Sequence, residues 1–431
     1  MSEQTATSKA GSYSAPQKTG FALGVLATVF FIFGFATAFK DPLVPHLKSI
    51  FGLSQWEADL IQFAFFSAYF LISIPSTVVV SKLGHQKSIV VGVAVMALGA
   101  AMIIPAAGLL SFALFLGALW VCAAGITLIQ VAANPFATLL GAPEKAPARL
   151  TLVQAFNSLG TTVAPVLGGL FILTKAREGV QTHADKLAQA GTVKTPYLIL
   201  AVLLLLLAFV ISRLKMPQPE RDTATGGAWG DVWRHPHLVF GIIAIFVYVG
   251  AEVTIGGHII NYVTAITSLT AQEATRYASL YWGGAMVGRF LGSAILGRFS
   301  GGKVLGVCGT MSLLCCVTTM TADGMIAVWA AVLVGLFNSI MFPTTFALAV
   351  NQLGPLTGKA SGLLNMAICG GALIPLLQGL VIDTAGHPEA GAAFSPAQVS
   401  AFHLSFLVPA ACYLWIMFYG FRGSRVKTAA A

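Results

Sequence analysis

Three charged side chains interrupt long apolar stretches of this chain: Asp41, Glu252 and Arg289. Each would cost roughly 2.5 to 3.5 kcal/mol at the centre of a bilayer, so such residues usually face a cavity or a partner of opposite charge. A buried carboxylate can accept hydrogen bonds from the hydroxyls of a polar solute, or it can carry a proton. We therefore expect Asp41 and Glu252 to be cation-coupling acids, with Glu252 also binding solute, and Arg289 to form a structural ion pair with one of them.

Neutral amides form a second set of polar side chains within apolar stretches. Spacings of four residues (Gln130 with Asn134) and three residues (Gln154 with Asn157) place both members of each pair on one helix face. Amides donate and accept hydrogen bonds, as binding of sugar hydroxyls requires, although they also join helices to one another. The expected substrate-binding amides are Gln130, Asn134, Gln154, Asn157, Asn338 and Asn365. The aromatic candidates for packing on a sugar ring are Tyr69 and Trp282.

The composition indicates which elements must hold these side chains. Hydrophobic residues make up 57% of the 431 residues and charged residues only 9%, against roughly 25% charged residues in soluble domains. Apolar runs of about 18 residues or more predict membrane-spanning helices. The chain is therefore expected to be an all-α membrane protein with twelve spans, near residues 21–45, 57–81, 88–107, 111–139, 150–174, 196–213, 237–264, 273–297, 304–321, 325–350, 360–382 and 400–421.

The two halves of the chain repeat a pattern of amides, glycines and prolines. Gln130 lies five residues before Pro135, and Asn338 lies five residues before Pro343. Further matched positions at identical separations are Arg149, Gly160, Pro165 and Gly169 in the first half, and Lys359, Gly370, Pro375 and Gly379 in the second. Such a repeat predicts two pseudo-symmetric six-helix bundles in parallel orientation, with the site between them and with helix kinks at the repeated prolines.

The expected organisation is a cytoplasmic tail (1–20), a first bundle (21–213), a cytoplasmic linker (214–236), a second bundle (237–421) and a cytoplasmic tail (422–431). The first 20 residues lack an apolar core, so we expect no cleavable signal and a first helix that stays in the mature protein. With both termini in the cytoplasm, 16 of the 24 Lys and Arg residues fall on cytoplasmic segments and seven on external ones. This bias follows the positive-inside rule.

The remaining composition excludes other classes of function. The net charge of +9 is explained by cytoplasmic loops facing anionic lipid headgroups, so it does not indicate nucleic-acid binding. The six cysteines show no metal-ligand spacing, and the eight histidines form no His-Glu-x-x-His motif. We therefore expect no metal, no cofactor and no enzymatic activity. The parallel repeat also disfavours a channel or a receptor.

Several strings together resemble one known family over nearly the whole chain. In the first half they are FFIFGF at 30–35 before Asp41, LIQ at 60–62, AANPF at 132–136 and FNS at 156–158. In the second half they are YVGAEV at 248–253, YWGG at 281–284, GR at 288–289 and FNSIMFPT at 337–344. The chain resembles the fucose:proton symporter family of the major facilitator superfamily, and its second half is most similar to the glucose/galactose transporter branch.

The resemblance implies a twelve-helix fold that works by alternating access. It places Asp41 at the family's proton-linked aspartate and Asn157 at a sugar-site asparagine. Two positions depart from the pattern. Gln130 stands where fucose symporters carry a glutamate, and it cannot titrate. Lys40 stands where relatives usually carry an asparagine, and a nearby ammonium favours the ionised form of Asp41.

The sequence thus favours a secondary transporter that imports a hexose resembling glucose or galactose, with a proton as co-substrate. Three alternatives stay open: coupling to sodium, an uncoupled hexose facilitator, and, more remotely, a multidrug exporter, whose cavity should be more apolar than this set of amides implies. We expect a functional monomer surrounded by lipid in the cell membrane, which is the inner membrane in a Gram-negative bacterium.

Overall fold

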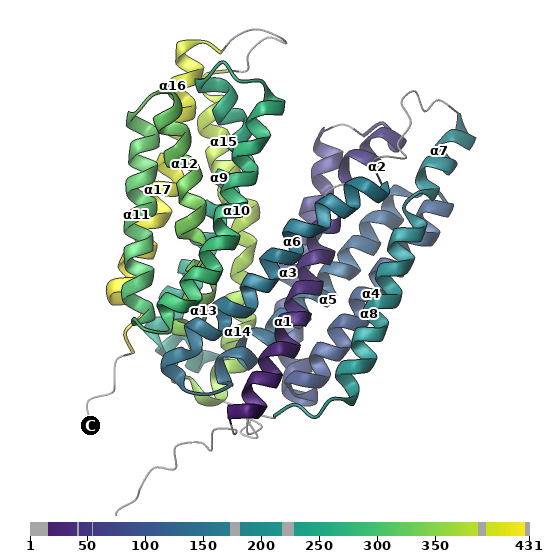
Figure 1. The fold of residues 1–431 in the computed structure, drawn as a ribbon, viewed down its shortest axis with the longest axis vertical. Coiled ribbons are helices and arrows are strands. Elements are labelled where there is room, and N and C mark those ends of the chain that lie inside the picture. Colours follow the sequence, from purple (N-terminus) through teal and green to yellow (C-terminus); the bar gives the residue numbers. More distant parts are fainter. Residues whose placement is uncertain are drawn as a thin grey trace, which may run out of the picture.

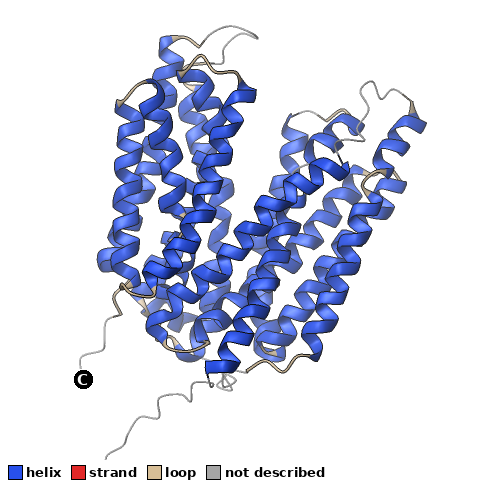
Figure 2. Ribbon diagram, in the orientation of Figure 1, coloured by secondary structure: helices blue, strands red, loops and turns tan. Residues whose placement is uncertain are grey.

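The computed structural model describes residues 16–40, 43–53, 55–172, 182–217, 228–386 and 394–426. Within these ranges the chain is helical, and no strand occurs in them (Figure 2). Eleven segments in the same ranges are long and apolar enough to cross a membrane. A further long helix, α10 (Ala271–Leu296), packs between α9 and α12. The chain is therefore a multi-pass membrane protein, and the expected all-α fold with twelve spans is confirmed.

The first group of helices packs around α5. Its α1 lies against α6, its α3 and α4 lie against α5, and its α8 covers α4. The short α7 begins with a capping box in which the Thr182 and Asp185 side chains and backbone amides satisfy one another. The elements are α1 (Pro16–Phe39), α2 (Leu43–Phe51), α3 (Gln55–Leu83), α4 (His85–Gly108), α5 (Phe112–Leu139), η1 (Pro143–Lys145), α6 (Ala146–Ile172), α7 (His183–Gly191) and α8 (Lys194–Arg213).

The second group packs around α9 (Pro236–Ile266), which contacts α15, α17, α13 and α10. A short 3₁₀ segment, η3 (Trp229–Arg234), leads into it. The other elements are α10 (Ala271–Leu296), α11 (Gly301–Thr321), α12 (Gly324–Asn338), α13 (Met341–Ala349), η4 (Gly354–Leu356), α14 (Thr357–Met366), η5 (Ala367–Cys369), α15 (Gly370–Asp383), α16 (Pro396–Ser405), α17 (Leu407–Phe418) and η6 (Tyr419–Gly423). We call the two groups the first and second bundles.

The bundles meet at one end of the molecule and diverge toward the other (Figure 1). The contacts between them join α6 to α10 and α13, and α14 to α3 and α5. Helix α1 begins and α17 ends at this same end. Two hydroxyls bond across it: Ser293 Oγ donates to the carbonyl of Ala148 at 2.9 Å, and Ser361 Oγ donates to the carbonyl of Val131 at 3.0 Å. We call this the closed end.

The sequence repeat is visible as matched glycine contacts in the two bundles. A Cβ on Gly160 of α6 would overlap the backbone of Phe31 on α1, and a Cβ on Gly370 of α15 would overlap the backbone of Phe246 on α9. Glycine at these positions lets two helix backbones touch, which is how membrane helices associate without a hydrophobic driving force. The two matched glycines therefore hold equivalent helix pairs together.

Helix interruptions differ between the halves. Helices α5 and α6 run unbroken through Pro135 and Pro165. In the second bundle the corresponding spans are divided, because α12 stops at Asn338 before Pro343 and a 3₁₀ turn separates α14 from α15. A proline removes the hydrogen bond to the residue four positions earlier, which weakens the preceding turn.

Candidate functional site

The first bundle contains two amides on α5 and one tyrosine on α3 at this site. Gln130 Nε2 donates to the Tyr69 hydroxyl at 2.9 Å, and both residues are buried. One turn along α5, Asn134 Oδ1 accepts a hydrogen bond from Gln154 Nε2 of α6 at 3.4 Å. The two amides of this face of α5 are therefore bonded to two different helices, Gln130 to α3 and Asn134 to α6. Asn134 is fully buried and Gln154 nearly so.

Asn157 lies where α6 crosses α1. Its Nδ2 donates to the carbonyl of Phe30 at 3.1 Å, and its side chain is only partly buried. Gly34 on α1 makes room for it, since a Cβ there would lie 2.5 Å from Asn157 Nδ2. One amide hydrogen is thus committed to α1, and the rest of the amide group is available to a solute.

The second bundle repeats the tyrosine–amide pair. Asn338 Nδ2 donates to the Tyr281 hydroxyl at 2.9 Å, and that hydroxyl donates to the carbonyl of Glu252 at 3.0 Å. Tyr248 donates to the carbonyl of Asn338 at 3.2 Å. Asn338 and both tyrosines are fully buried, so a solute can reach Asn338 only after these helices move. Trp282, by contrast, is 44% exposed beside Tyr281.

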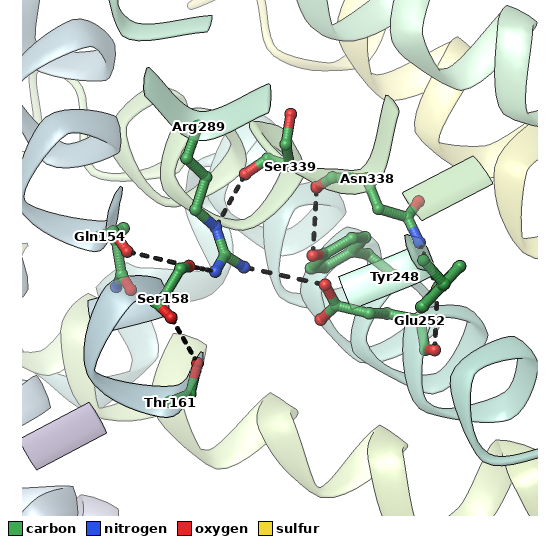
Figure 3. Close-up of polar contacts among 9 residues, drawn as sticks. Gln154, Ser158, Thr161, Tyr248, Glu252, Arg289, Asn338 and Ser339 are labelled. Atoms are coloured by element: carbon green, nitrogen blue, oxygen red, sulfur yellow. Dashed lines mark hydrogen bonds and ion pairs between the residues drawn. The ribbon is translucent and has the colours of Figure 1, made fainter. Parts of the chain in front are cut away.

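The intramembrane charges Glu252 and Arg289 lie together. Arg289 Nη2 of α10 is 3.8 Å from Glu252 Oε1 of α9, with 15% and 12% of the two side chains exposed. Arg289 Nε donates to the carbonyl of Ser339 at 3.1 Å, and its Nη1 donates to the Ser158 hydroxyl on α6 (Figure 3). The guanidinium therefore neutralises the carboxylate and also bridges the two bundles.

Asn365 stands apart from this constellation. Its Nδ2 donates to the carbonyl of Ser361, one turn earlier on α14, and its side chain is fully buried. The structure places it beside the hydroxyl that bonds across the closed end. Asp41 lies outside the described residues.

The structure brings together Glu252, Arg289 and the amides of α5 and α6 along the facing surfaces of the bundles. Ser158 is not among the predicted site residues, although it lies four residues after Gln154 and therefore shares its helix face. Tyr281, the counterpart of Tyr69 in the repeat, is not among the predicted site residues either. Comparing the two halves residue by residue would have found Tyr281, because both tyrosines bond to the amide that precedes the repeated proline by five residues.

Within the described ranges no group of three His, Cys, Asp or Glu side chains could hold a metal ion. The six cysteines are free, and all are buried or partly buried. They pack as small apolar residues.

Two bundles of repeated topology that face each other across a polar, charged surface are the architecture of a secondary transporter. The chain belongs to the Major Facilitator Superfamily, whose family model matches residues 26–375. It is accordingly a transporter, not an enzyme.

Individual relatives refine this picture. The chain is 45% identical over 416 residues to a glucose/galactose transporter of Brucella abortus biovar 1 (strain 9-941), which covers 96% of each chain. It is 31% identical over 404 residues to an L-fucose-proton symporter of Escherichia coli (strain K12), covering 89% of this chain and 92% of the relative. A crystal structure of the transporter FucP in the outward conformation superposes with a TM-score of 0.83 at 30% identity, covering 94% of this chain and 98% of the other. The expected family resemblance is confirmed.

Proposed function

We propose that this protein imports a hexose of the glucose or galactose type by proton-coupled symport. The observation that carries the proposal is the link that Arg289 makes between the Glu252 carboxylate of α9 and Ser158 of α6, the residue next to the Asn157 amide. The Trp282 indole of α10, 44% exposed, is the proposed aromatic partner. Amide and carboxylate groups match the hydroxyls of a sugar, and an aromatic surface matches the apolar face of its ring. The glucose/galactose transporter named above supports the hexose, and the L-fucose-proton symporter supports the proton.

The other amides complete the proposed substrate site in two ways. Gln130 and Gln154 are each 7% exposed, and we propose that they bind hydroxyls directly, with Tyr69 held in place by Gln130. Asn134, Asn338 and Asn365 are fully buried in this conformation. We propose that they bind substrate, or position residues that do, when the helices rearrange during transport.

Asp41 and Glu252 are the proposed coupling acids. A carboxylate couples two fluxes only if it takes its proton from one side and releases it on the other, which requires that sugar occupancy change its affinity for the proton. Gln130 cannot serve in this role because its amide does not titrate. Glu252 is suited to it because its carboxylate is largely buried and Arg289, 3.8 Å away, compensates its charge once the proton has been released.

The proposed topology places both termini and the closed end in the cytoplasm, with bundle boundaries at 21–213 and 237–421 and the linker at 214–236. The excess of Lys and Arg on these segments supports it. The protein would then open to the outside in the conformation described above, as a monomer in the cell membrane, which is the inner membrane in a Gram-negative organism.

Radiolabelled glucose uptake into proteoliposomes tests this proposal. Uptake is measured with no gradient, with an inward proton gradient and with an inward sodium gradient, for the wild type, Asp41→Asn and Glu252→Gln. The matched control is Glu144→Gln, which removes an exposed carboxylate from η1. Accumulation driven by the proton gradient, lost in Asp41→Asn and retained in the control, is the expected result.

Each other outcome replaces one part of the proposal. Accumulation driven only by sodium would make the protein a sodium symporter, and equilibration without accumulation would make it a facilitator. Absence of glucose and galactose flux, together with no competition by hexoses for binding, would overturn the substrate and favour an exporter of apolar compounds.

A further inference from the structure

The Arg289 side chain connects three elements at the interface of the bundles. Its guanidinium is hydrogen-bonded to the Ser158 hydroxyl of the first bundle and to the Ser339 carbonyl of the second, and it lies 3.8 Å from the Glu252 carboxylate (Figure 3). Two serine hydroxyls also donate hydrogen bonds across this interface, each to a backbone carbonyl. Neither of these two bonds involves a charged group, whereas the contact made by Arg289 does. The state of one charge can therefore influence the fit of one bundle against the other.

Burial makes this arrangement sensitive to the charge of its carboxylate. Only 15% of the Arg289 side chain and 12% of the Glu252 side chain are exposed. Within the described residues, Glu252 Oε1 accepts no hydrogen bond. Removing one partner of a buried ion pair is far more costly than burying the pair, because the other charge is left without compensation. Arg289 stays charged at any physiological pH, so loss of the negative charge on Glu252 leaves a buried cation.

Other titratable groups near the pair do not change charge in the same range. The groups that interact electrostatically with Glu252 are Arg289, Tyr248 and Tyr281. Behind Tyr281 lie Cys316 of α11 and Tyr413 of α17. Phenols and thiols are neutral between about pH 5 and 7.5. Helices α12 and α13 contain no titratable residue. Titratable residues outside this set lie elsewhere on α9 and α10 and on the elements packed against them: Arg149, Asp231, Arg234, His237, His258, Tyr262, Glu273, Arg276, Tyr277, Lys303, Cys308, Cys315, Lys359, Cys369, Asp383, His403, Cys412, Tyr419 and Arg422. The histidines among them change charge between about pH 5 and 8, so the variants that lack Glu252 are measured at both pH values.

We propose that Arg289 is a positioning residue that links the charge of Glu252 to closure between the bundles. While Glu252 is ionised, the pair lets Arg289 remain buried against Ser158 and hold α6 to α10. When Glu252 is neutralised, the guanidinium regains solvation by separation of α6 from α10, which opens the closed end. The inference rests on the proposed function for one point, namely that the cation reaching Glu252 is a proton.

The sign of this linkage suits a symporter. A proton that enters from the open side and binds Glu252 weakens the contact that keeps the opposite end shut. Release of that proton to the other side restores the ion pair and favours return to the starting conformation. The ion pair thus acts on the conformational equilibrium in addition to any contact that Glu252 makes with sugar.

A distance measurement between spin labels tests the proposal without sugar. The labels replace Lys145 of η1 and Arg298, two exposed residues on opposite bundles that lie three and five residues from the bond between Ala148 and Ser293 across the closed end. The native cysteines, six in number, are replaced by alanine in this protein. Asp41→Asn is included so that this acid does not contribute. Double electron–electron resonance in lipid nanodiscs then gives the ratio of long to short distances at pH 5.5 and 7.5. We expect this ratio to rise about tenfold at the lower pH, since the pair is buried but not wholly shielded.

Three variants make the outcome decisive. Glu252→Gln should give the high ratio at both pH values, and the doubly neutral Glu252→Gln with Arg289→Gln should return to the low ratio at both, because no unpaired charge remains. Ser158→Ala should reduce the pH response at least threefold, since Arg289 then no longer bonds to α6. A structural role alone would not make the double variant close again.

The proposal is overturned if Glu252→Gln stays short at pH 7.5, if the double variant resembles the single one, or if the pH response persists without Glu252. Because no sugar is present, the test is independent of transport. A Glu252-dependent distance in a protein that moves no hexose would contradict the proposed function and leave this linkage standing. Hexose symport with a distance indifferent to Glu252 would do the reverse.

Discussion

A single methyl group on α1 should displace the amide that we propose as a sugar ligand. Gly34 faces Asn157 so closely that a Cβ in its place would overlap the backbone oxygen of Asn157, which is its nearest neighbour, and would lie 2.5 Å from Asn157 Nδ2 and 2.9 Å from Asn157 Cγ. Real Cβ atoms do not approach other atoms to this extent, so Gly34→Ala forces the asparagine to move. Its hydrogen bond to the Phe30 carbonyl is then lost or lengthened.

The expected cost combines three terms. Overpacking of a close helix contact costs about 1 to 3 kcal/mol, and the lost hydrogen bond adds about 1 kcal/mol. Replacing glycine by alanine within a helix returns roughly 0.5 to 1 kcal/mol. The net destabilisation is therefore about 1 to 3.5 kcal/mol, which corresponds to a fall in melting temperature of roughly 2 to 14 °C for a bundle of this size.

Thermal unfolding in detergent, followed by glucose uptake in proteoliposomes, measures both consequences of Gly34→Ala. The control is Gly24→Ala on the same helix, where an added Cβ meets nothing within 4 Å. The control should unfold at or slightly above the wild-type temperature and transport normally. If Gly34→Ala is as stable and as active as Gly24→Ala, then the contact between α1 and Asn157 does not position the amide, and our assignment of Asn157 loses its structural support.

Three further predictions follow from single contacts. Tyr281→Phe leaves the buried Asn338 amide without its acceptor and should lower stability by about 1 to 3 kcal/mol in thermal unfolding. The control Tyr277→Phe should be neutral, because the Tyr277 hydroxyl makes a single contact in the described residues, with a methionine sulfur at 3.9 Å. Burial lowers the pKa of His46 in α2, outside the membrane spans. The protein should therefore lose stability as pH falls below about 6.5, and the melting temperature of His46→Asn should fall less in acid than that of the wild type. An equal fall in both proteins would contradict this. Ser361→Ala removes the hydroxyl that bonds to α5 across the closed end. It should raise the ratio of long to short label distances about fivefold or more. An unchanged ratio would show that this bond does not hold the bundles together.

The sequence predicted the fold because membrane helices leave a strong one-dimensional signal. Long apolar runs have few alternative structures in lipid, where every backbone group must be bonded within its own segment. The repeated spacing of Gly160 and Gly370 predicted two similar bundles, and in the structure each of these glycines lets two helix backbones touch. Helix interruptions in the second bundle could not be predicted from the prolines, because Pro135 and Pro343 have equivalent settings in sequence and yet only the second follows a break.

The polar side chains were identifiable, but their accessibility was not. Amides at Asn157 and Asn338 have the same donors and acceptors, and in the sequence both interrupt apolar runs. The structure exposes part of the first and buries the second behind two tyrosines. Rotation of a helix about its axis decides such differences, and neighbouring helices set that rotation. The partners of Arg289 were likewise beyond the sequence, since Ser158 lies 131 positions away.

The two tyrosine–amide pairs suggest why a repeated fold can bind an asymmetric solute. Each bundle places an amide five residues before a proline and bonds it to a tyrosine, Gln130 with Tyr69 and Asn338 with Tyr281. The first pair has no carboxylate next to it in the described residues. The Tyr281 hydroxyl of the second donates to the backbone carbonyl of Glu252, the residue that carries the carboxylate. Repetition therefore supplies a common frame for both bundles, while the charged pair is present in only one of them. We infer that the second bundle, through Glu252 and Arg289, contributes a charge that drives the change of conformation, in addition to the coupling acid proposed at Asp41 in the first bundle.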